Sequence, residues 1–342
     1  HGCFSGHGHQ HHSLNMNWKK ALSLSVFFAI GVFLFVKLMD MVEDKAELFE
    51  YMSSAPIWAI SVTFIMGFLA IVSRGYRWLL LIEPMGYTAS GFRAVCAVAF
   101  GYLANTFVPR SGEVARCAAL NSTDDIPVNK LLGTVITERV VDLIMLFLFM
   151  SIALLTNYDA VISLLGQIKP PDSSGLQYYI IVFVLAILLL VFMVRRTNQS
   201  NNPIQKKMVE FVSGIGKGIK SVLLMKHRVA FVLHTFFIWI MYFLMSYGLY
   251  ISMEGSSGIG VFESIWVMVS GGFGMVFPAP GGIGSYQWAV TLGFESLGYD
   301  RLVGVSVGNV VWITQTGMII IVGTLGYFFL AAYRVSLKKS KP

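Results

Sequence analysis

Long apolar runs separated by short polar segments dominate the hydrophobic pattern of the chain. An α-helix needs roughly 20 apolar residues to cross the ~30 Å hydrocarbon core of a bilayer, and six runs reach or approach that length with their flanks. These runs span residues 21–39, 57–72, 131–155, 178–194, 229–253 and 302–332. The pattern predicts an all-α polytopic membrane protein with about six transmembrane helices.

Two further apolar stretches are interrupted by prolines and glycines. The first spans 92–120 and is broken by "NTFVPRSGE" (105–113), and the second spans 261–297 and is broken by "FPAPGGIGSYQ" (277–287). Irregular backbone at membrane depth is tolerated only where it is buried in protein or lines a watery cavity. We therefore expect two re-entrant helical hairpins, each with its break facing a cavity. The alternative is two ordinary helical hairpins with proline turns.

The distribution of lysine and arginine predicts how these segments are oriented. Residues 195–228 hold eight lysines and arginines, whereas the three loops expected on the opposite side hold two lysines. Because cytoplasmic loops carry the excess of basic residues, we expect both termini in the cytoplasm and the protein in the cytoplasmic (inner) membrane. In this interpretation Arg74, Arg77 and Lys130 are cytoplasmic flanks of the first hairpin, whereas the second hairpin has acidic external flanks.

The two hairpins would then enter from opposite sides, which predicts inverted repeats. Broken segments at corresponding positions of inverted halves often mark the substrate site of a transporter. The first half spans about 56–194 and the second about 229–333. An amphipathic cytoplasmic segment at 195–228 either lies along the membrane surface or simply connects the halves. The His-rich residues 1–15 are interpreted as an expression tag, so that 16–342 form a single membrane domain.

Composition narrows the classes of function. Charged residues make up 13% of the chain, whereas a soluble domain has about 25%. The three cysteines have no metal-ligand spacing, and no basic patch with interleaved aromatic residues favours nucleic acid as a partner. No catalytic motif is found, so we expect neither an enzyme nor a bound cofactor or metal.

The strongest chemical signal is a set of charges in and after the first break. In "NTFVPRSGEVAR" and "TVITERVVDLIM" the charged residues are Arg110, Glu113, Arg116, Glu138, Arg139 and Asp142. An isolated charge within a membrane costs roughly 2.5–3.5 kcal/mol, so these residues are expected to pair, line a pathway or bind a ligand.

Two interpretations of these charges remain open. In one, the network only neutralises itself, with Arg110 or Arg116 bound to Glu138, and Arg139 bound to Asp142. In the other, an arginine also binds a lipid phosphate, because the guanidinium fork suits phosphate oxygens. A carboxylate released in this way could take up a proton, which would make coupling to a proton gradient possible.

The second break contains a different candidate binding feature, the N-terminus of a helix. After Pro278 and Pro280, "GGIGSYQW" opens a short helix whose first N–H groups could bind an anion. Tyr286 and Gln287 could donate hydrogen bonds there, and the same cavity could be lined by Asn309, Thr314 and Gln315. A glycine-rich break is also what the close crossing of two helices requires.

The ordered motifs "NTFVPRSGEVAR", "TERVVD" and "PAPGGIGSYQ" resemble the transmembrane-region family of lysylphosphatidylglycerol synthases, over essentially all of 16–342. The resemblance implies inverted repeats with re-entrant hairpins, and movement of a lipid, most familiarly an aminoacylated phospholipid, between leaflets. By motif match the first polar site would comprise Asn105, Pro109, Arg110, Gly112, Glu113, Arg116, Glu138, Arg139 and Asp142. The second would comprise Pro280, Gly281, Gly282 and Gly284.

Two features depart from the family pattern. An acidic residue often follows the glycine motif in the family, whereas Tyr286 and Gln287 stand there in this chain. The cytoplasmic domain that transfers the amino acid is also missing from the sequence. We therefore expect a separate lipid synthase to make the cargo.

Together these observations predict a flippase-like transporter for an anionic or aminoacylated phospholipid, or for a polyprenyl-phosphate-linked lipid. The alternatives are a non-transporting lipid-binding scaffold and a membrane-embedded enzyme subunit with Glu113 or Glu138 as acid or base. Oligomeric state is left open. The expected substrate-binding residues are Asn105, Arg110, Glu113, Arg116, Glu138, Arg139, Asp142, Gly281, Gly282, Gly284, Tyr286 and Gln287.

Overall fold

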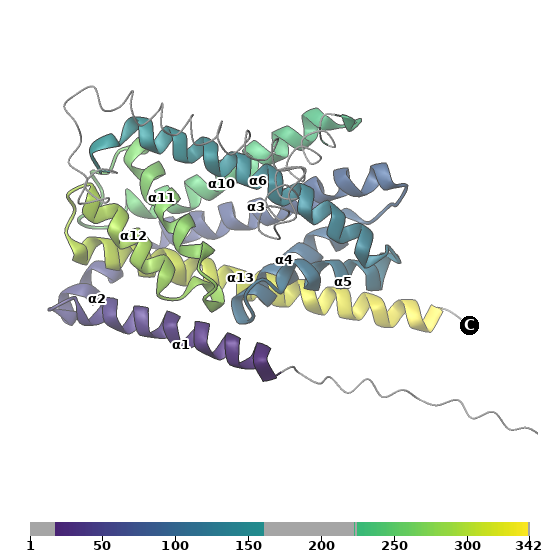
Figure 1. Ribbon diagram of the computed structural model, residues 1–342, viewed down its shortest axis with the longest axis horizontal. Helices are drawn as coiled ribbons and strands as arrows, with labels where there is room; N and C mark the ends of the chain where they lie inside the picture. Colours follow the sequence, from purple (N-terminus) through teal and green to yellow (C-terminus); the bar gives the residue numbers. More distant parts are fainter. Residues whose placement is uncertain (1–17, 161–221, 223, 341–342) are drawn as a thin grey trace, which may run out of the picture.

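The computed structural model describes residues 18–160, 222 and 224–340, and this part of the chain is helical with no strand. The helices of the first part are α1 (Trp18–Asp40), α2 (Lys45–Ser53), α3 (Ile57–Ile82), α4 (Gly91–Phe107), α5 (Gly112–Asp124) and α6 (Val128–Thr156). Those of the second part are α10 (Arg228–Tyr250), α11 (Val261–Val276), α12 (Ser285–Ser296) and α13 (Arg301–Ser340). Two 3-10 turns, η1 (Glu83–Met85) and η3 (Pro280–Gly282), complete the described elements (Figure 1).

Four of the described helices, α3, α6, α10 and α13, are long and apolar enough to cross a membrane. A fifth candidate is the pair formed by α1 and α2, which is bent by 102°. These candidates coincide with five of the six predicted runs. The sixth run, 178–194, lies outside the described residues. The proposed tag and most of the 195–228 segment also lie outside them. The chain is thus an all-α polytopic membrane protein, and six crossings remain a prediction.

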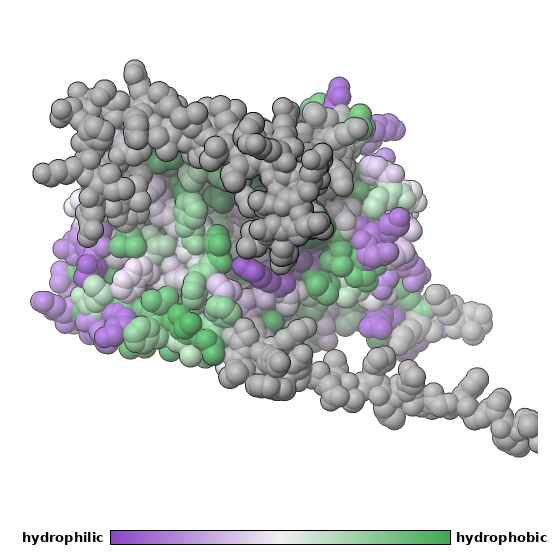
Figure 2. Space-filling model, viewed as in Figure 1, coloured by the Kyte–Doolittle hydropathy of each residue, from purple (hydrophilic) through white to green (hydrophobic). Residues whose placement is uncertain are grey.

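Apolar side chains cover much of the outer surface as well as the interior. Leu233 of α10, Ile136 of α6 and Phe328 of α13 are each more than 60% exposed, as suits helices that face lipid. Figure 2 shows hydrophilic residues gathered at the two ends of the long axis, with mostly hydrophobic ones between. The molecule therefore has the polar–apolar–polar banding of a membrane protein.

Both predicted breaks are present. Between α4 and α5, the Ser111 amide donates to the Val108 carbonyl (3.1 Å) and closes a turn with Pro109 in its second position. Gly101 and Gly112 let the two helices cross closely, because a Cβ on Gly112 would overlap the Gly101 carbonyl oxygen. Each broken stretch is thus a pair of packed helices, and re-entry into the membrane stays a prediction.

The break between α11 and α12 also depends on small residues. A Cβ on Gly274 of α11 would lie 2.5 Å from the Ser285 carbonyl oxygen of α12. Gly284 has a positive φ of 76° and packs against the backbone of Gly31, so α1 covers this turn. Only glycine fits both the backbone conformation and the space there.

The tips of the two hairpins meet in the middle of the molecule. Gly281 of the second tip packs against Thr106 of the first, and Trp312 of α13 donates from Nε1 to the Gly281 carbonyl (2.8 Å). In Figure 1, α5 lies toward the C-terminal end of α13, whereas α11 and α12 lie toward its other end. The hairpins thus approach from opposite ends, and the division into inverted halves remains a prediction.

Candidate functional site

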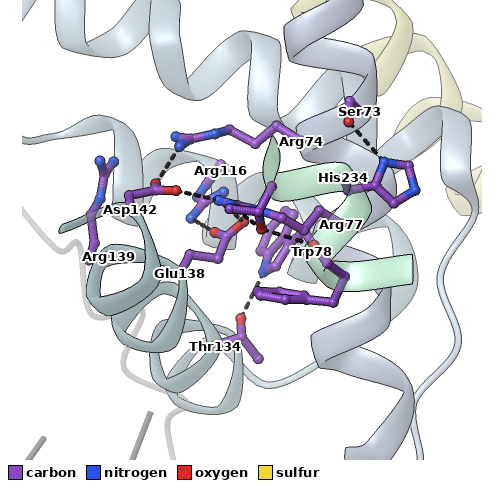
Figure 3. A network of polar contacts seen from close by, with 12 residues as sticks. Ser73, Arg74, Arg77, Trp78, Arg116, Thr134, Glu138, Arg139, Asp142 and His234 are labelled. Carbon is purple, nitrogen blue, oxygen red and sulfur yellow. Dashed lines mark hydrogen bonds and ion pairs between the residues drawn. The ribbon is translucent and has the colours of Figure 1, made fainter. Parts of the chain in front are cut away.

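A buried cluster of charges lies where α3, α5 and α6 pack together (Figure 3). Arg74 and Arg77 share one face of α3, one turn apart. They face Glu138 and Asp142, which are four residues apart on α6, and Arg116 of α5 completes the cluster. The Arg77 and Glu138 side chains are 0% and 1% exposed, so these charges depend on one another for compensation.

Ion pairs connect every member of the cluster. Asp142 pairs with Arg74 and also accepts from Arg77 Nη2 (2.9 Å). Glu138 pairs with Arg116 and lies 3.6 Å from Arg77. Three arginines therefore share two carboxylates, which leaves the buried cluster with one surplus positive charge.

Neutral side chains fix the orientation of these arginines. Arg77 donates from Nη1 to Thr235 of α10 (3.1 Å), and the Arg116 guanidinium lies 4.7 Å from the centre of the Trp78 ring. Trp78 is itself held by a 2.7 Å hydrogen bond from Nε1 to Thr134. Beside the cluster, Ser73 Oγ and His234 Nδ1 lie 2.8 Å apart. Packing and hydrogen bonds thus hold the charges in one arrangement.

The structure confirms one predicted ion pair and corrects another. Arg116 does pair with Glu138, but Arg139 pairs with Glu113 and not with Asp142. The prediction for Asp142 was wrong because its carboxylate faces α3, where two arginines compete for it.

Arg74 and Arg77 lie buried within α3 and not in a loop that flanks the first hairpin, whereas their cytoplasmic side stays a prediction. Helix α3 continues to Ile82, well past the apolar run 57–72, and carries both arginines into the protein. Their spacing of three residues on a long apolar helix is the signal that could have found them.

The cluster borders a cavity of about 410 Å³ between the two hairpin tips. Its walls carry the charged residues Arg74, Arg110, Glu113, Arg139 and Asp142. The first tip adds Asn105, Thr106 and Pro109, and the second adds Phe277, Pro278, Ala279, Gly281 and Gly282. The cavity is thus shared by both breaks. We call it the polar cavity because its charged residues lie on the side of the cluster, although aromatic and other apolar side chains form most of its wall.

Arg110 stands apart from the other arginines. Its side chain lines the cavity, it is exposed, and no described residue forms an ion pair with it. Its backbone has a φ of 63°, in the third position of the turn where glycine is usual. A strained residue of this kind is a candidate for function.

A second cavity, of about 320 Å³, adjoins the first and is mostly apolar. The two cavities share the wall residues Tyr102, Trp239, Tyr242, Met275, Gln315 and Ile319. The Tyr102 and Tyr242 hydroxyls form a 2.8 Å hydrogen bond between α4 and α10. A polar hollow therefore continues into an apolar one, as an amphiphilic ligand requires.

Seven of the twelve predicted site residues line the polar cavity, namely Asn105, Arg110, Glu113, Arg139, Asp142, Gly281 and Gly282. Arg116 and Glu138 lie behind it in the cluster, and Tyr286 lines the apolar cavity. Of the α13 residues, Gln315 lines both cavities, whereas Asn309 and Thr314 line neither. The aromatic walls formed by Tyr102, Trp239, Tyr242 and Trp312 were not predicted, because single aromatic residues on apolar helices give no distinctive pattern.

The start of α12 differs from the expectation of free N–H groups facing an anion. The Gly284 amide donates to Gln287 Oε1 (2.8 Å), and the Ser285 amide donates to the Ile283 carbonyl (2.9 Å). Gln287 is fully buried, and neither Gly284 nor Gln287 lines either cavity. This helix start is therefore capped within the chain.

Comparison with known proteins identifies a family that matches most of the chain. The family described as "Lysylphosphatidylglycerol synthase TM region" matches residues 21–323, which include both hairpins and the charged cluster. No curated protein and no solved structure matches the chain. Within the described residues, no group of three or more His, Cys, Asp or Glu is placed to hold a metal ion.

Proposed function

Because the chain belongs to the family of lysylphosphatidylglycerol synthase transmembrane regions, we propose that it is a flippase-like transporter that moves a lipid between membrane leaflets. The cargo is an anionic or aminoacylated phospholipid, or a polyprenyl-phosphate-linked lipid, made by a separate synthase. The observation that carries the proposal is the pair of adjoining cavities, one polar and one apolar, beside both hairpin tips. The pair suits a lipid headgroup with the start of its acyl chains.

Arg110 is the residue that would bind the headgroup. It is exposed in the polar cavity and free of any carboxylate in the described part of the chain, so its planar fork is available to phosphate oxygens. Its neighbour pair Glu113–Arg139 lies on the same wall and would contact the rest of the headgroup. In this proposal, the buried cluster fixes the cavity wall and the hairpin tips separate to let the lipid pass.

Exchange of a labelled anionic lipid in reconstituted vesicles tests this function. A charge-assisted hydrogen bond contributes about 1.5–3 kcal/mol, so Arg110→Ala should slow exchange at least about tenfold. Asp125→Ala is the matched control, because Asp125 is also exposed and also has a positive φ (54°), but lies at the far end of α5. Equal exchange by Arg110→Ala and the unchanged protein would refute the proposal.

The proposal assigns the chain a transport role without a chemical step or a cofactor. Glu113 and Glu138 act in it as ion-pair partners of arginines and not as acid or base. Mass spectrometry of lipids incubated with the pure protein tests this part, since a changed lipid mass would favour a membrane-embedded enzyme. Exchange rates measured with and without a pH gradient across the vesicles then show whether protons are coupled.

We place both termini on the cytoplasmic side of the inner membrane, following the excess of basic residues in 195–228. The variants Lys339→Cys and Ser54→Cys test this orientation in intact cells with an impermeant maleimide. The proposal expects labelling at position 54 alone, and labelling of position 339 from outside would reverse the orientation.

A further inference from the structure

We propose that the headgroup bound in the polar cavity carries two negative charges, as a phosphate monoester or a diphosphate ester does. This inference rests on the proposed transport function and names its class of substrate. It follows from the balance of charges around the cavity.

In the described part of the chain, the charged residues of the cavity wall and of the cluster behind it are five arginines and three carboxylates. They are Arg74, Arg77, Arg110, Arg116, Arg139, Glu113, Glu138 and Asp142. No other charged residue that the structure describes lines either cavity. Two positive charges are therefore uncompensated by any residue that the structure describes. Uncompensated charge is expensive in the buried cluster, and Arg110 has no partner there, so a bound anion is the natural partner of this surplus.

Both surplus charges reach the wall of the same cavity. One belongs to Arg110, which has no ion-pair partner among the described residues. The other belongs to the buried cluster, where three arginines share two carboxylates, and Arg74 brings this cluster to the cavity wall. Arg139 adds no surplus, because it pairs with Glu113. A phosphate between Arg74 and Arg110 would be held from two sides.

The net charge of a lipid headgroup then decides how well it matches the surplus positive charge. A phosphate monoester carries about −1.5 to −2 at neutral pH, which matches the surplus. A phosphodiester carries one negative charge and would leave one arginine uncompensated. A phospholipid bearing a dibasic amino acid is net positive and would increase the surplus. The adjoining apolar cavity favours a lipid over a soluble phosphate ester, because it offers acyl chains a place beside the headgroup.

The test compares headgroups in vesicles of phosphatidylcholine that contain the full chain, at pH 8. We expect labelled phosphatidic acid to exchange at least about tenfold faster than phosphatidylglycerol, and lysylphosphatidylglycerol to be slowest. Arg110→Gln removes one of the two surplus charges, so the preference for phosphatidic acid should fall toward equality. Asp125→Asn, at the end of α5, should leave the preference unchanged.

Each other outcome has a defined meaning. Exchange of phosphatidylglycerol as fast as phosphatidic acid would overturn the inference while leaving the transporter intact. If no lipid exchanges, the proposed function fails, and binding of the same labelled lipids to the detergent-solubilised protein then decides the headgroup. Displacement of bound phosphatidic acid by glycerol 3-phosphate at similar concentration would show that soluble phosphate esters, and not lipids, are preferred.

Discussion

Arg110 combines an unusual backbone with an unusual charge environment. Its φ of 63° belongs to the left-handed region, which costs an ordinary residue roughly 1–2 kcal/mol and glycine almost nothing. Asp125 has the same feature at the end of α5, where it caps the helix away from both cavities. Variants at these two positions can therefore be compared to separate the effect of backbone strain from the effect of the arginine side chain on lipid exchange.

Replacing Arg110 by glycine should relieve this strain but, like Arg110→Ala, slow lipid exchange at least about tenfold. We expect the free energy of unfolding to rise by up to about 1 kcal/mol, because glycine adopts this backbone freely but is more flexible when unfolded. Thermal unfolding in detergent measures the gain, and vesicle exchange measures the loss. Asp125→Gly should show the gain alone, and a loss of stability in Arg110→Gly would contradict the strain argument.

Glu138 and Glu113 are both paired with arginine, but their burial differs. The Glu138 side chain is 1% exposed, whereas Glu113 is 25% exposed and its partner Arg139 is 50% exposed. Removing one partner of a buried pair leaves an uncompensated charge and costs about 3–5 kcal/mol, whereas an exposed pair contributes about 0–1 kcal/mol.

Glu138→Gln should therefore destabilise the protein severely, and Glu113→Gln should change its stability little. The melting temperature in detergent measures both. Similar melting temperatures for the two variants would mean that Glu138 is better hydrated than its burial indicates.

Close helix crossings shape the molecule at the scale of its elements. Helices α4 and α5 meet at Gly101 and Gly112, and the Gly112 amide donates to Asn105 Oδ1 (2.7 Å). The breaks themselves were predictable, because proline and glycine act locally on the backbone. The crossing partners were not, because they depend on how two separate helices pack.

Gly112→Ala should force the first hairpin apart. The added Cβ would overlap the Gly101 carbonyl oxygen and lie 2.6 Å from Asn105 Nδ2, so we expect a loss of about 1–3 kcal/mol. Gly133→Ala is the matched control, since a Cβ there meets nothing within 4 Å and alanine favours the helix by about 0.5–1 kcal/mol. Thermal unfolding should shift in opposite directions for the two variants.

At the scale of the whole molecule, the adjoining cavities form the route proposed for the lipid. Gly272 of α11 lines the apolar cavity, and a Cβ placed on it meets nothing within 4 Å. A larger side chain at this position would enter empty space and not the packed core.

Gly272→Leu should therefore occupy part of the apolar cavity and slow exchange of every lipid at least about tenfold, with little change in melting temperature. Gly317→Leu on α13 is the control, because its Cβ also meets nothing within 4 Å but it lines neither cavity. Unchanged exchange in Gly272→Leu would exclude the apolar cavity from the route.

The sequence allowed prediction of the membrane class, the apolar runs and both breaks, because each follows from local composition. It also indicated most charged residues of the site. It could not assign the partners of Asp142, since Arg74 and Arg77 lie 68 and 65 residues away in the chain. Charge pairing across helices depends on their rotation about their own axes, which periodicity alone leaves undetermined. The start of α12 was also mispredicted. There the Gln287 side chain accepts a hydrogen bond from the Gly284 amide, and the sequence pattern does not show this contact.

The hydrogen bond from Trp312 to the Gly281 carbonyl has a practical consequence. It places an intrinsic fluorophore against the tip of the second hairpin. Any opening of that junction breaks the bond and changes the polarity around the indole, to which tryptophan emission responds. The difference in spectra between the native chain and Trp312→Phe would thus follow the tip during turnover without an attached dye.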